Sequence, residues 1–258
     1  MKISFIGSGN VATHLALAFQ KTGHSVLSVY SKNYQHAVRF CKKIKRCCPV
    51  RKISELNPTS EIIFICVTDR EVEKIVSREF ISKKVALVHT SGSMSLDVFS
   101  EIPNPCGVFY PLQTFTKNIP VDFSNVPVLL ESKNRELLKK LKALSKSIGA
   151  SGTVVNSQKR AWIHLSAVFA SNFTNHLLSI AEKILKNNKL NFKLLHPLIM
   201  ETFQKALRVG PEKAQTGPAK RGDSKIIKQH LKLLKTEPRV RLLYERLTGS
   251  IVDFKDKG

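Results

Sequence analysis

The sequence predicts an α/β domain with a parallel sheet, followed by an all-α C-terminal domain. In the first half of the chain, short apolar strand-like segments alternate with helical segments, the pattern of parallel α/β folds. From Ser157 to Leu247 the segments have only helical periodicity. A glycine-containing turn at residues 7–12 joins the first strand to the first helix. The expected domains are therefore residues 1–153 and residues 154–258.

The strands of the first domain are expected where short apolar segments are bounded by turn residues or by helical segments. They are Lys2–Ile6, Ser25–Tyr30, Glu61–Val67, Val85–His89, Val108–Tyr110 and Val126–Leu130. Helices are expected between them, because apolar residues recur there at a spacing of three or four. These helices are Asn10–Thr22, a basic helix that runs to about Arg46, a short charged helix before Val85, and Arg135–Ser147.

The second domain should consist of helices joined by short loops. The expected helices are Gln158–Asn187, Leu190–Val209, Ser224–Leu234 and Pro238–Leu247. The segment TGPAKRGD lies between Leu190–Val209 and Ser224–Leu234, and we expect it to form a rigid interhelical loop. Gly217 and Pro218 would end one helical segment, Gly222 would allow a turn, and Asp223 would cap the next helix.

Composition limits the classes of protein to consider. The chain has 258 residues, 42% of them hydrophobic, and no run of the roughly 18–20 apolar residues that a membrane span needs. Glycines and an asparagine come too early in MKISFIGSGN for a signal-peptide core. We therefore expect a cytoplasmic protein with no membrane partner.

The five cysteines form no C-x-x-C pair and have no histidine at zinc-finger spacing, so the sequence predicts neither disulfides nor a metal site.

The formal net charge of +23 raises the hypothesis of nucleic-acid binding. The cations, however, are scattered over the whole chain, and basic segments such as residues 42–46 and 138–146 fit the solvated faces of helices. No aromatic residues alternate with them to stack on bases. A lysine-rich surface explains the charge better than a nucleic-acid partner does.

The turn after the first strand has the sequence G-x-G-x-x-A, from Gly7 through Gly9 to Ala12. It follows a strand and opens a helix, which is the context of a dinucleotide-binding, Rossmann-like turn. Gly7 would permit the tight turn, and Gly9 would let a pyrophosphate approach the backbone. The N–H groups at Asn10 and Val11, at the start of the helix, would bind the anion. The alternative is a glycine turn without a ligand.

The end of the second strand indicates which dinucleotide is bound. NAD sites usually place an acidic residue there to bind the ribose 2′-hydroxyl, but no Asp or Glu precedes Glu55. Ser31 and Lys32 end the strand instead, and Arg39 follows one or two turns later. A hydroxyl and a cation suit a 2′-phosphate, so NADP(H) is the predicted cofactor. The alternative is that Lys32 is one more surface lysine.

Ligands of open parallel sheets bind at the carboxyl ends of the strands. Thr68 follows the third expected strand, and Thr90 follows the fourth. We expect both side chains to contact the cofactor, although either threonine could instead cap a helix.

Six segments together resemble a known family: GSGNVATHLA, VYSKN, VHTSGS, GVFYPLQTF, HLSAVFASNFTNHL and TGPAKRGD. They resemble Rossmann-like NADP oxidoreductases whose helical C-terminal domain has no assigned function. This family is similar in plan to pyrroline-5-carboxylate reductase and to deazaflavin-dependent NADP oxidoreductases. The resemblance covers essentially the whole chain. It implies NADP(H) as cofactor and a homodimer formed through the helical domain, but it defines no substrate.

Polar residues along the longest expected helix are candidates for catalysis. His164, Val168, Ser171 and Asn175 recur on one helical face, with Asn172 beside them. His164 is the acid/base candidate, because an unperturbed imidazole titrates near neutrality. Asn172 would hold a carbonyl or carboxylate group. In related dehydrogenases a lysine and an asparagine lie on this helix, and Lys159 could take the part of that lysine. The alternative for His164 is a structural histidine at an interface.

Two loops supply further candidates. Arg221, in TGPAKRGD, could bind an anionic substrate group, because a guanidinium binds carboxylates in a bidentate manner. The alternative is an ion pair with an acid such as Asp223. Gln113 and Thr114, in YPLQTF, could adjoin the substrate or the nicotinamide, or merely pack.

The leading functional hypothesis is an NADP(H)-dependent oxidoreductase. It would transfer a hydride to or from a C=O or C=N bond of a small molecule bound in the interdomain cleft. The alternative hypothesis is an NADP(H)-binding regulatory or sensor protein without turnover.

Overall fold

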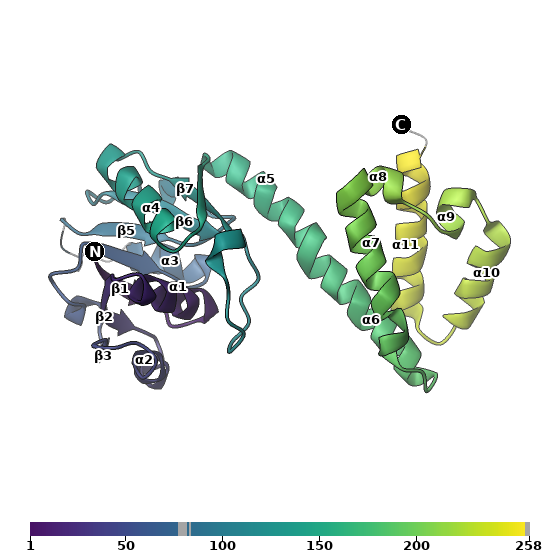
Figure 1. Cartoon of the computed structure of the whole chain (residues 1–258), viewed down its shortest axis with the longest axis horizontal. Coiled ribbons are helices and arrows are strands. Elements are labelled where there is room, and N and C mark those ends of the chain that lie inside the picture. The colour runs from purple at the N-terminus through teal and green to yellow at the C-terminus, as the bar shows by residue number, and fades with distance from the viewer. Residues whose placement is uncertain (77–81, 83, 256–258) are drawn as a thin grey trace. The chain divides into compact units, whose positions relative to one another are not determined.

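The computed structural model describes residues 1–76, 82 and 84–255, and it divides into two compact units (Figure 1). The first unit is Met1–Asn172 and contains the sheet. The second unit is Phe173–Gly258 and, over its described residues, consists of helices and loops. The domain boundary expected between residues 153 and 154 stays a prediction. Within the described part of the chain, every helix is too short or too polar to cross a bilayer.

One eight-stranded sheet forms the centre of the first unit, with the strand order β3-β2-β1-β4-β5-β6-β7-β8. All neighbouring strands are parallel except β6 and β7. The chain adds strands on one side of β1 and then on the other, so β1 and β4 form a topological switch point. The strands are β1 Lys2–Ile6, β2 Ser25–Tyr30, β3 Cys48–Val50, β4 Ile62–Ile65, β5 Ala86–His89, β6 Cys106–Pro111, β7 Pro127–Glu131 and β8 Ser151–Val154.

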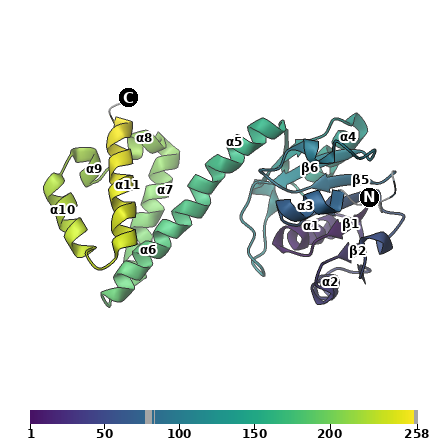
Figure 2. The ribbon, with the colours of Figure 1, turned by 180° about the vertical axis from the view of Figure 1, so that it is seen from behind.

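Alternating strand residues build two cores, one on each face of the sheet. In β1, Phe5 belongs to a core that also holds buried side chains of α1 (Asn10–Lys21), α2 (Tyr34–Cys41) and α4 (Arg135–Ser147). Its neighbour Ile6 belongs to the core beneath α3 (Asp69–Val76) and the 3₁₀ helix Leu96–Phe99. Accordingly α1 faces the viewer in Figure 1 and α3 does so in Figure 2. Burial on both faces explains why the central strands are continuously apolar.

The prediction of a Rossmann-like sheet followed by helices is confirmed. Two short strands were not predicted: β3, Cys48–Val50, and β8, Ser151–Val154. The basic helix expected to reach Arg46 ends at Cys41, because the chain must turn to add β3 beside β2. Residues 77–81 and 83, which follow α3, lie outside the described residues.

The long helix expected at Gln158–Asn187 is helical but not uniformly α-helical. It consists of α5 (Ser157–Ala167), a π-helical segment (Val168–Phe173) and α6 (Thr174–Asn187). A π-helical turn contains more residues than an α-helical turn, so positions beyond Val168 rotate away from an ideal period of 3.6. The polar face expected from His164 to Asn175 was derived from that ideal period, and it stays a prediction.

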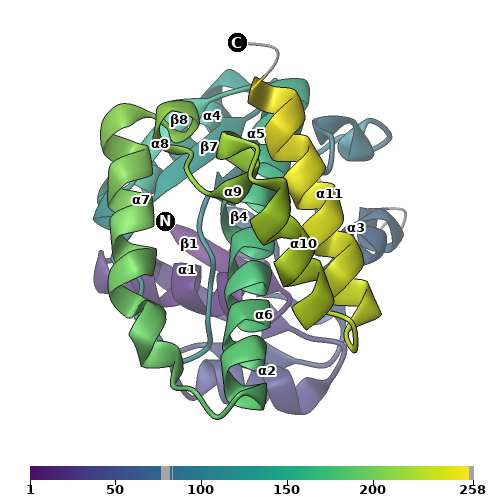
Figure 3. The same cartoon turned by 90° about the vertical axis from the view of Figure 1, so that its right-hand side faces the viewer.

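Over its described residues, the second unit contains α6, the 3₁₀ helix Phe192–Leu195 and five later α-helices (Figure 3). Those five are α7 His196–Val209, α8 Pro211–Ala214, α9 Pro218–Arg221, α10 Ser224–Leu233 and α11 Pro238–Lys255. The segment TGPAKRGD is not a simple loop, because its centre forms the single helical turn α9. Gly222 adopts a left-handed φ of 73°, and the Asp223 carboxylate accepts a hydrogen bond from the Ile226 N–H at 3.2 Å. The predicted turn and helix cap are thus confirmed.

The second unit, taken by itself, has almost no buried apolar core. Ala219 is the single buried apolar residue among its described residues. Large apolar side chains are instead exposed on several helices, which we call the apolar helical surface. Five of them are at least 63% exposed: Leu194, Leu198, Leu207, Leu233 and Phe254. Exposed apolar side chains of this kind are typical of a surface that binds a partner when they lie together in one patch.

Candidate functional site

The glycine turn joins β1 to the N-terminus of α1. Gly7 has a φ of 100°, and its N–H donates to the carbonyl of Tyr30 at 2.8 Å. A Cβ at this position would lie 2.3 Å from the carbonyl oxygen of Cys66, so no side chain fits. A Cβ on Gly9 would meet no atom within 4 Å. The backbone at Gly9 is therefore open to the close approach of a phosphate.

A cavity of about 490 Å³ opens beside this turn at the carboxyl ends of β1, β2 and β4. Gly7, Gly9, Ser31, Lys32 and Thr68 all line it, so the structure brings five of the predicted cofactor-binding residues together. The Ser8 hydroxyl, in the turn, donates to the hydroxyl of Ser31 at 3.0 Å. This bond links the glycine turn to the end of β2. We call this cavity the β2-side cavity.

Sequence reasoning missed an ion pair in the β2-side cavity. Glu71 and Lys74, on α3, both line it, and the Lys74 ammonium donates to Glu71 at 2.8 Å. The hydrogen bond from Lys74 lowers the pKa of the Glu71 carboxyl. The Thr68 carbonyl accepts the backbone N–H groups of Glu71 and Val72, which fixes the start of this helix. The signal that could have revealed Glu71 is its position in the first turn of the helix that follows β4, a strand that ends at the cavity.

Three other predicted cofactor residues lie near the turn but are not among the described residues that line the β2-side cavity. The Asn10 amide donates to the carbonyl of Phe115 at 2.8 Å. Val11 packs against the core. The Thr90 hydroxyl hydrogen-bonds to Cys66, whose thiol has a pKa raised to about 12 mainly by burial. Among the described residues, no three potential metal ligands form a cluster.

A second polar cluster lies at the carboxyl ends of β5 and β6. The Tyr110 hydroxyl, on β6, is 3.0 Å from Nδ1 of His164, on α5, and the two rings meet edge-on. Both side chains press against Gly92, because a Cβ there would lie 2.7 Å from His164 Nδ1 and from the Tyr110 ring. Burial raises the pKa of Tyr110, so its phenol stays protonated at neutral pH. The cluster therefore offers a phenol and an imidazole in direct contact.

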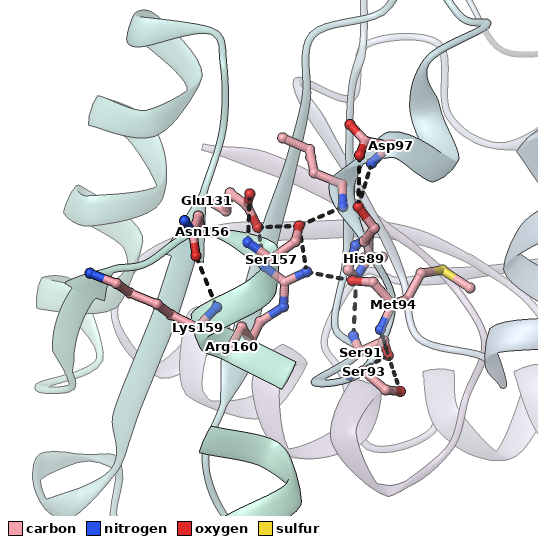
Figure 4. A network of polar contacts seen from close by, with 12 residues as sticks. His89, Ser91, Ser93, Met94, Asp97, Glu131, Asn156, Ser157, Lys159 and Arg160 are labelled. Atoms are coloured by element: carbon pink, nitrogen blue, oxygen red, sulfur yellow. Dashed lines mark hydrogen bonds and ion pairs between the residues drawn. The ribbon is translucent and has the colours of Figure 1, made fainter. Parts of the chain in front are cut away.

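A buried ion pair holds α5 against the sheet (Figure 4). Arg160 is completely buried, and its guanidinium donates to the Glu131 carboxylate at the end of β7 and to the carbonyl of Met94. Ser157 completes the network: its N–H and hydroxyl donate to Glu131 at 2.9 and 2.8 Å, and its hydroxyl accepts from the Leu96 N–H at 2.9 Å. Since His164 lies one turn beyond Arg160, this network positions its imidazole.

His89, at the end of β5, lies beside this network (Figure 4). Its Nδ1 accepts the Ser91 N–H at 3.2 Å, which places the proton of the neutral ring on Nε2. Burial, and then the charge of Arg160, lowers its pKa to about 3. His89 is therefore neutral in the folded protein at neutral pH.

We predict that His89 makes stability fall in mild acid. The unfolded imidazole binds a proton below about pH 6.5, whereas the folded one does so only below about pH 3. The unfolded state thus binds more protons within this window, and stability falls as pH drops through it. Acidification from pH 7 to pH 5 should cost up to about 2 kcal/mol, measured by urea unfolding. His89→Gln should flatten this dependence, and parallel wild-type and variant profiles would refute the assignment.

The remaining candidate residues are spread over both units. Lys159 is exposed, and its side chain extends away from the loop that holds Ser91 and Ser93 (Figure 4). Asn172 is exposed in the π-helical segment, and Arg221 is exposed at the end of α9 in the second unit. Their proposed roles stay predictions.

Gln113 and Thr114 lie just beyond the end of β6, which carries Tyr110. Gln113 and Thr114 line a separate cavity of about 330 Å³, and the Gln113 side chain accepts the N–H of Thr114 at 2.7 Å. Sequence reasoning chose these two residues from YPLQTF and missed Tyr110. The signal that could have identified Tyr110 is its position at the end of a strand, where ligands bind in such sheets.

Two family models match the chain. Residues 2–91 match the model described as NADP oxidoreductase, coenzyme F420-dependent. Residues 126–251 match a domain of unknown function, DUF2520. A comparison with the curated proteins gave no match.

Solved structures similar to this chain include proteins that bind NADP. The putative NADP oxidoreductase of Bacteroides fragilis is 35% identical, with a TM-score of 0.91, over 98% of each chain. An imine reductase of Myxococcus stipitatus, solved with NADP⁺, is 15% identical with a TM-score of 0.69, covering 100% of this chain and 95% of its own. Pyrroline-5-carboxylate reductase of Streptococcus pyogenes is 11% identical with a TM-score of 0.64, over 98% of each chain. The last two similarities show the fold alone.

Proposed function

The chain belongs to the NADP oxidoreductase family, and on that premise we propose that it is an enzyme that transfers a hydride between NADP(H) and a C=O or C=N bond of a small molecule. The observation that carries this proposal is the Tyr110–His164 pair. It lies at the carboxyl edge of the same sheet whose glycine turn and β2-side cavity suit the cofactor. A proton source and a hydride source are the two requirements of such a reduction.

The described residues of the β2-side cavity fit NADP(H). The open backbone at Gly9 and the N-terminus of α1 would bind the pyrophosphate. Ser31 and Lys32 would bind the 2′-phosphate, since both line the cavity and the second strand ends without a carboxylate. Glu71 does not oppose this role, because Lys74 neutralises it.

The chain's own residues would supply the proton that accompanies hydride transfer. When bound, NADPH supplies the hydride to the carbon of the C=O or C=N bond. The Tyr110 phenol, protonated at neutral pH, would donate its proton to the substrate oxygen or nitrogen. His164, 3.0 Å away, would then reprotonate the phenolate. Asn172, Lys159 and Arg221 are proposed to orient the substrate.

We further propose that two copies pair through the apolar helical surface. Obligate dimer interfaces are rich in apolar side chains, and Leu198 and Leu207 of this surface are 63% and 88% exposed. Light scattering should give twice the 28.9 kDa of one chain. A Leu198→Glu/Leu207→Glu variant should shift the protein toward monomer, and a monomeric wild-type protein would refute the proposal.

Cofactor preference follows from the end of β2. Lys32→Gln should weaken NADPH binding about tenfold, because one charge-assisted hydrogen bond is lost at an exposed site. NADH, which lacks the 2′-phosphate, should bind wild type and variant equally. Calorimetric titration measures both affinities, with Lys139→Gln, an exposed lysine on α4, as the control. An equal loss for NADH and NADPH would remove Lys32 from the phosphate site.

The proposed reaction is tested by NADPH oxidation over a panel of keto acids, cyclic imines and aldehydes. Turnover of one panel member would support the proposal that the protein is an enzyme. Tight NADPH binding without turnover of any member would favour the alternative of a regulatory or sensor protein.

A further inference from the structure

A second cavity, of about 390 Å³, also adjoins the glycine turn at Ser8 and Gly9. Its walls are α1, the segment from α2 to Lys43, and residues 117–120 of the connection between β6 and β7. We call it the α1–α2 cavity. The two cavities share only Ser8, Gly9 and His36 among the described residues that line them. Ser31 and Lys32, assigned above to the 2′-phosphate, line the other cavity. Arg39, which follows the second strand by one or two turns, lines this one.

The α1–α2 cavity is strongly basic. Arg39, Lys43 and Lys117 line it together with the imidazoles of His14 and His36, and none of the described lining residues is acidic. No ion pair involving these three cations is found among the described residues. Like charges that converge on one concave surface repel one another and attract anions. The cavity therefore has the electrostatics of an anion site.

The same cavity also has an apolar lining. Leu17, on α1, is 40% exposed, and Ile119 is 59% exposed, with Phe40 and Pro120 beside them in the lining. An inorganic ion would leave these side chains in water, whereas an organic anion would cover them. The lining thus favours a ligand with a charged head and an apolar body.

The wall formed by the β6–β7 connection is held in place by α1. The Asn10 amide donates to the carbonyl of Phe115 at 2.8 Å, and Nε2 of His14 is 3.1 Å from the carbonyl of Thr116. The His14 ring also packs against Phe115, with 5.3 Å between centroids. Two side chains of α1 therefore anchor the chain that leads into the wall.

We propose that the α1–α2 cavity is a second binding site for a small phosphate monoester with an apolar body; it adjoins the cofactor site at Gly9 and Asn10 but would bind its ligand through other residues. Arg39 and Lys43 bind the phosphate, and Leu17 and Ile119 contact the apolar group. Phosphate is favoured over a single carboxylate because three cations and two imidazoles line the cavity. This inference goes beyond the proposed reaction, since it concerns a ligand that binds while NADP(H) is in place.

The test is calorimetric titration of 1-naphthyl phosphate into the full-length protein saturated with NADPH. We expect one molecule to bind per chain, and uncharged 1-naphthol not to bind measurably. An Arg39→Gln/Lys43→Gln variant should lose at least about tenfold in affinity for the probe. Leu17→Ser should also lower the affinity for the probe, but it should not change the affinity for inorganic phosphate.

Lys32→Gln is the matched control: it should weaken the binding of NADPH while leaving the affinity for the probe unchanged. Competition between NADPH and the probe would overturn the proposal, because it would place the probe in the cofactor site. Unchanged binding by Arg39→Gln/Lys43→Gln would overturn it as well. Neither result depends on NADPH turnover, so failure of this inference is separable from failure of the proposed reaction.

Discussion

Replacement of Arg160 with methionine is expected to lower the free energy of unfolding by about 3–5 kcal/mol. The variant leaves the Glu131 carboxylate, only 16% exposed, without its guanidinium partner, and it removes a donor from the Met94 carbonyl. Removing one member of a buried ion pair is costly because the other charge stays desolvated. Urea unfolding followed by circular dichroism measures the loss.

Two variants separate the buried pair from an ordinary surface cation. Lys133→Met breaks an exposed pair with Asp97 in the same unit, and it should leave stability unchanged within error. Arg160→Met/Glu131→Gln should recover part of the loss, because the uncompensated charge is removed. Equal stability of Arg160→Met and wild type would contradict the network in Figure 4.

The Tyr110→Phe variant is expected to lower kcat/KM by about 10²–10³-fold with the best substrate of the panel. It removes the phenol proton while retaining the ring that packs beside His164 and Gly92. NADPH affinity should change by less than about threefold, since Tyr110 does not line the β2-side cavity. His164→Gln should lower kcat/KM by a similar factor. The loss in the double variant should be far smaller than the product of the two single losses, because the two groups act together.

The second unit offers a matched control for this pair. Tyr244 and His230 repeat the geometry, with 2.9 Å between the hydroxyl and Nδ1 and with edge-on rings. Tyr244→Phe removes an equivalent hydrogen bond and should leave turnover unchanged. If Tyr110→Phe and Tyr244→Phe lowered turnover equally, the loss would be structural rather than catalytic.

Much of the sheet could be predicted because its central strands are buried on both faces. IIFICV and VALVH are continuously apolar for that reason, and the glycine turn follows β1 directly. The strands β3 and β8 were missed because the first is three residues long and the second, SGTV, is exposed and largely polar. The π-helical segment was missed because a single sequence gives no signal for a changed helical period.

The site was harder to predict than the fold, because its parts come together from distant positions. Tyr110 and His164 are 54 residues apart, and only the fold places them against Gly92. Arg160 is one of 42 lysines and arginines, and nothing in the local sequence distinguishes it from a surface cation. The glycine turn, Ser31 and Lys32 were predictable, since a phosphate site is built from residues near one turn.

Isotope transfer tests most directly whether this family member transfers a hydride. The panel substrates would be incubated with NADPH that carries deuterium at C4 of the nicotinamide, in one configuration at a time. The masses of the products would then be measured by mass spectrometry. We predict that the product of one substrate gains one deuterium from one configuration only, and that Tyr110→Phe slows this gain about 10²–10³-fold. Retention of all deuterium in NADPH with every substrate, despite tight and selective NADPH binding, would contradict the account.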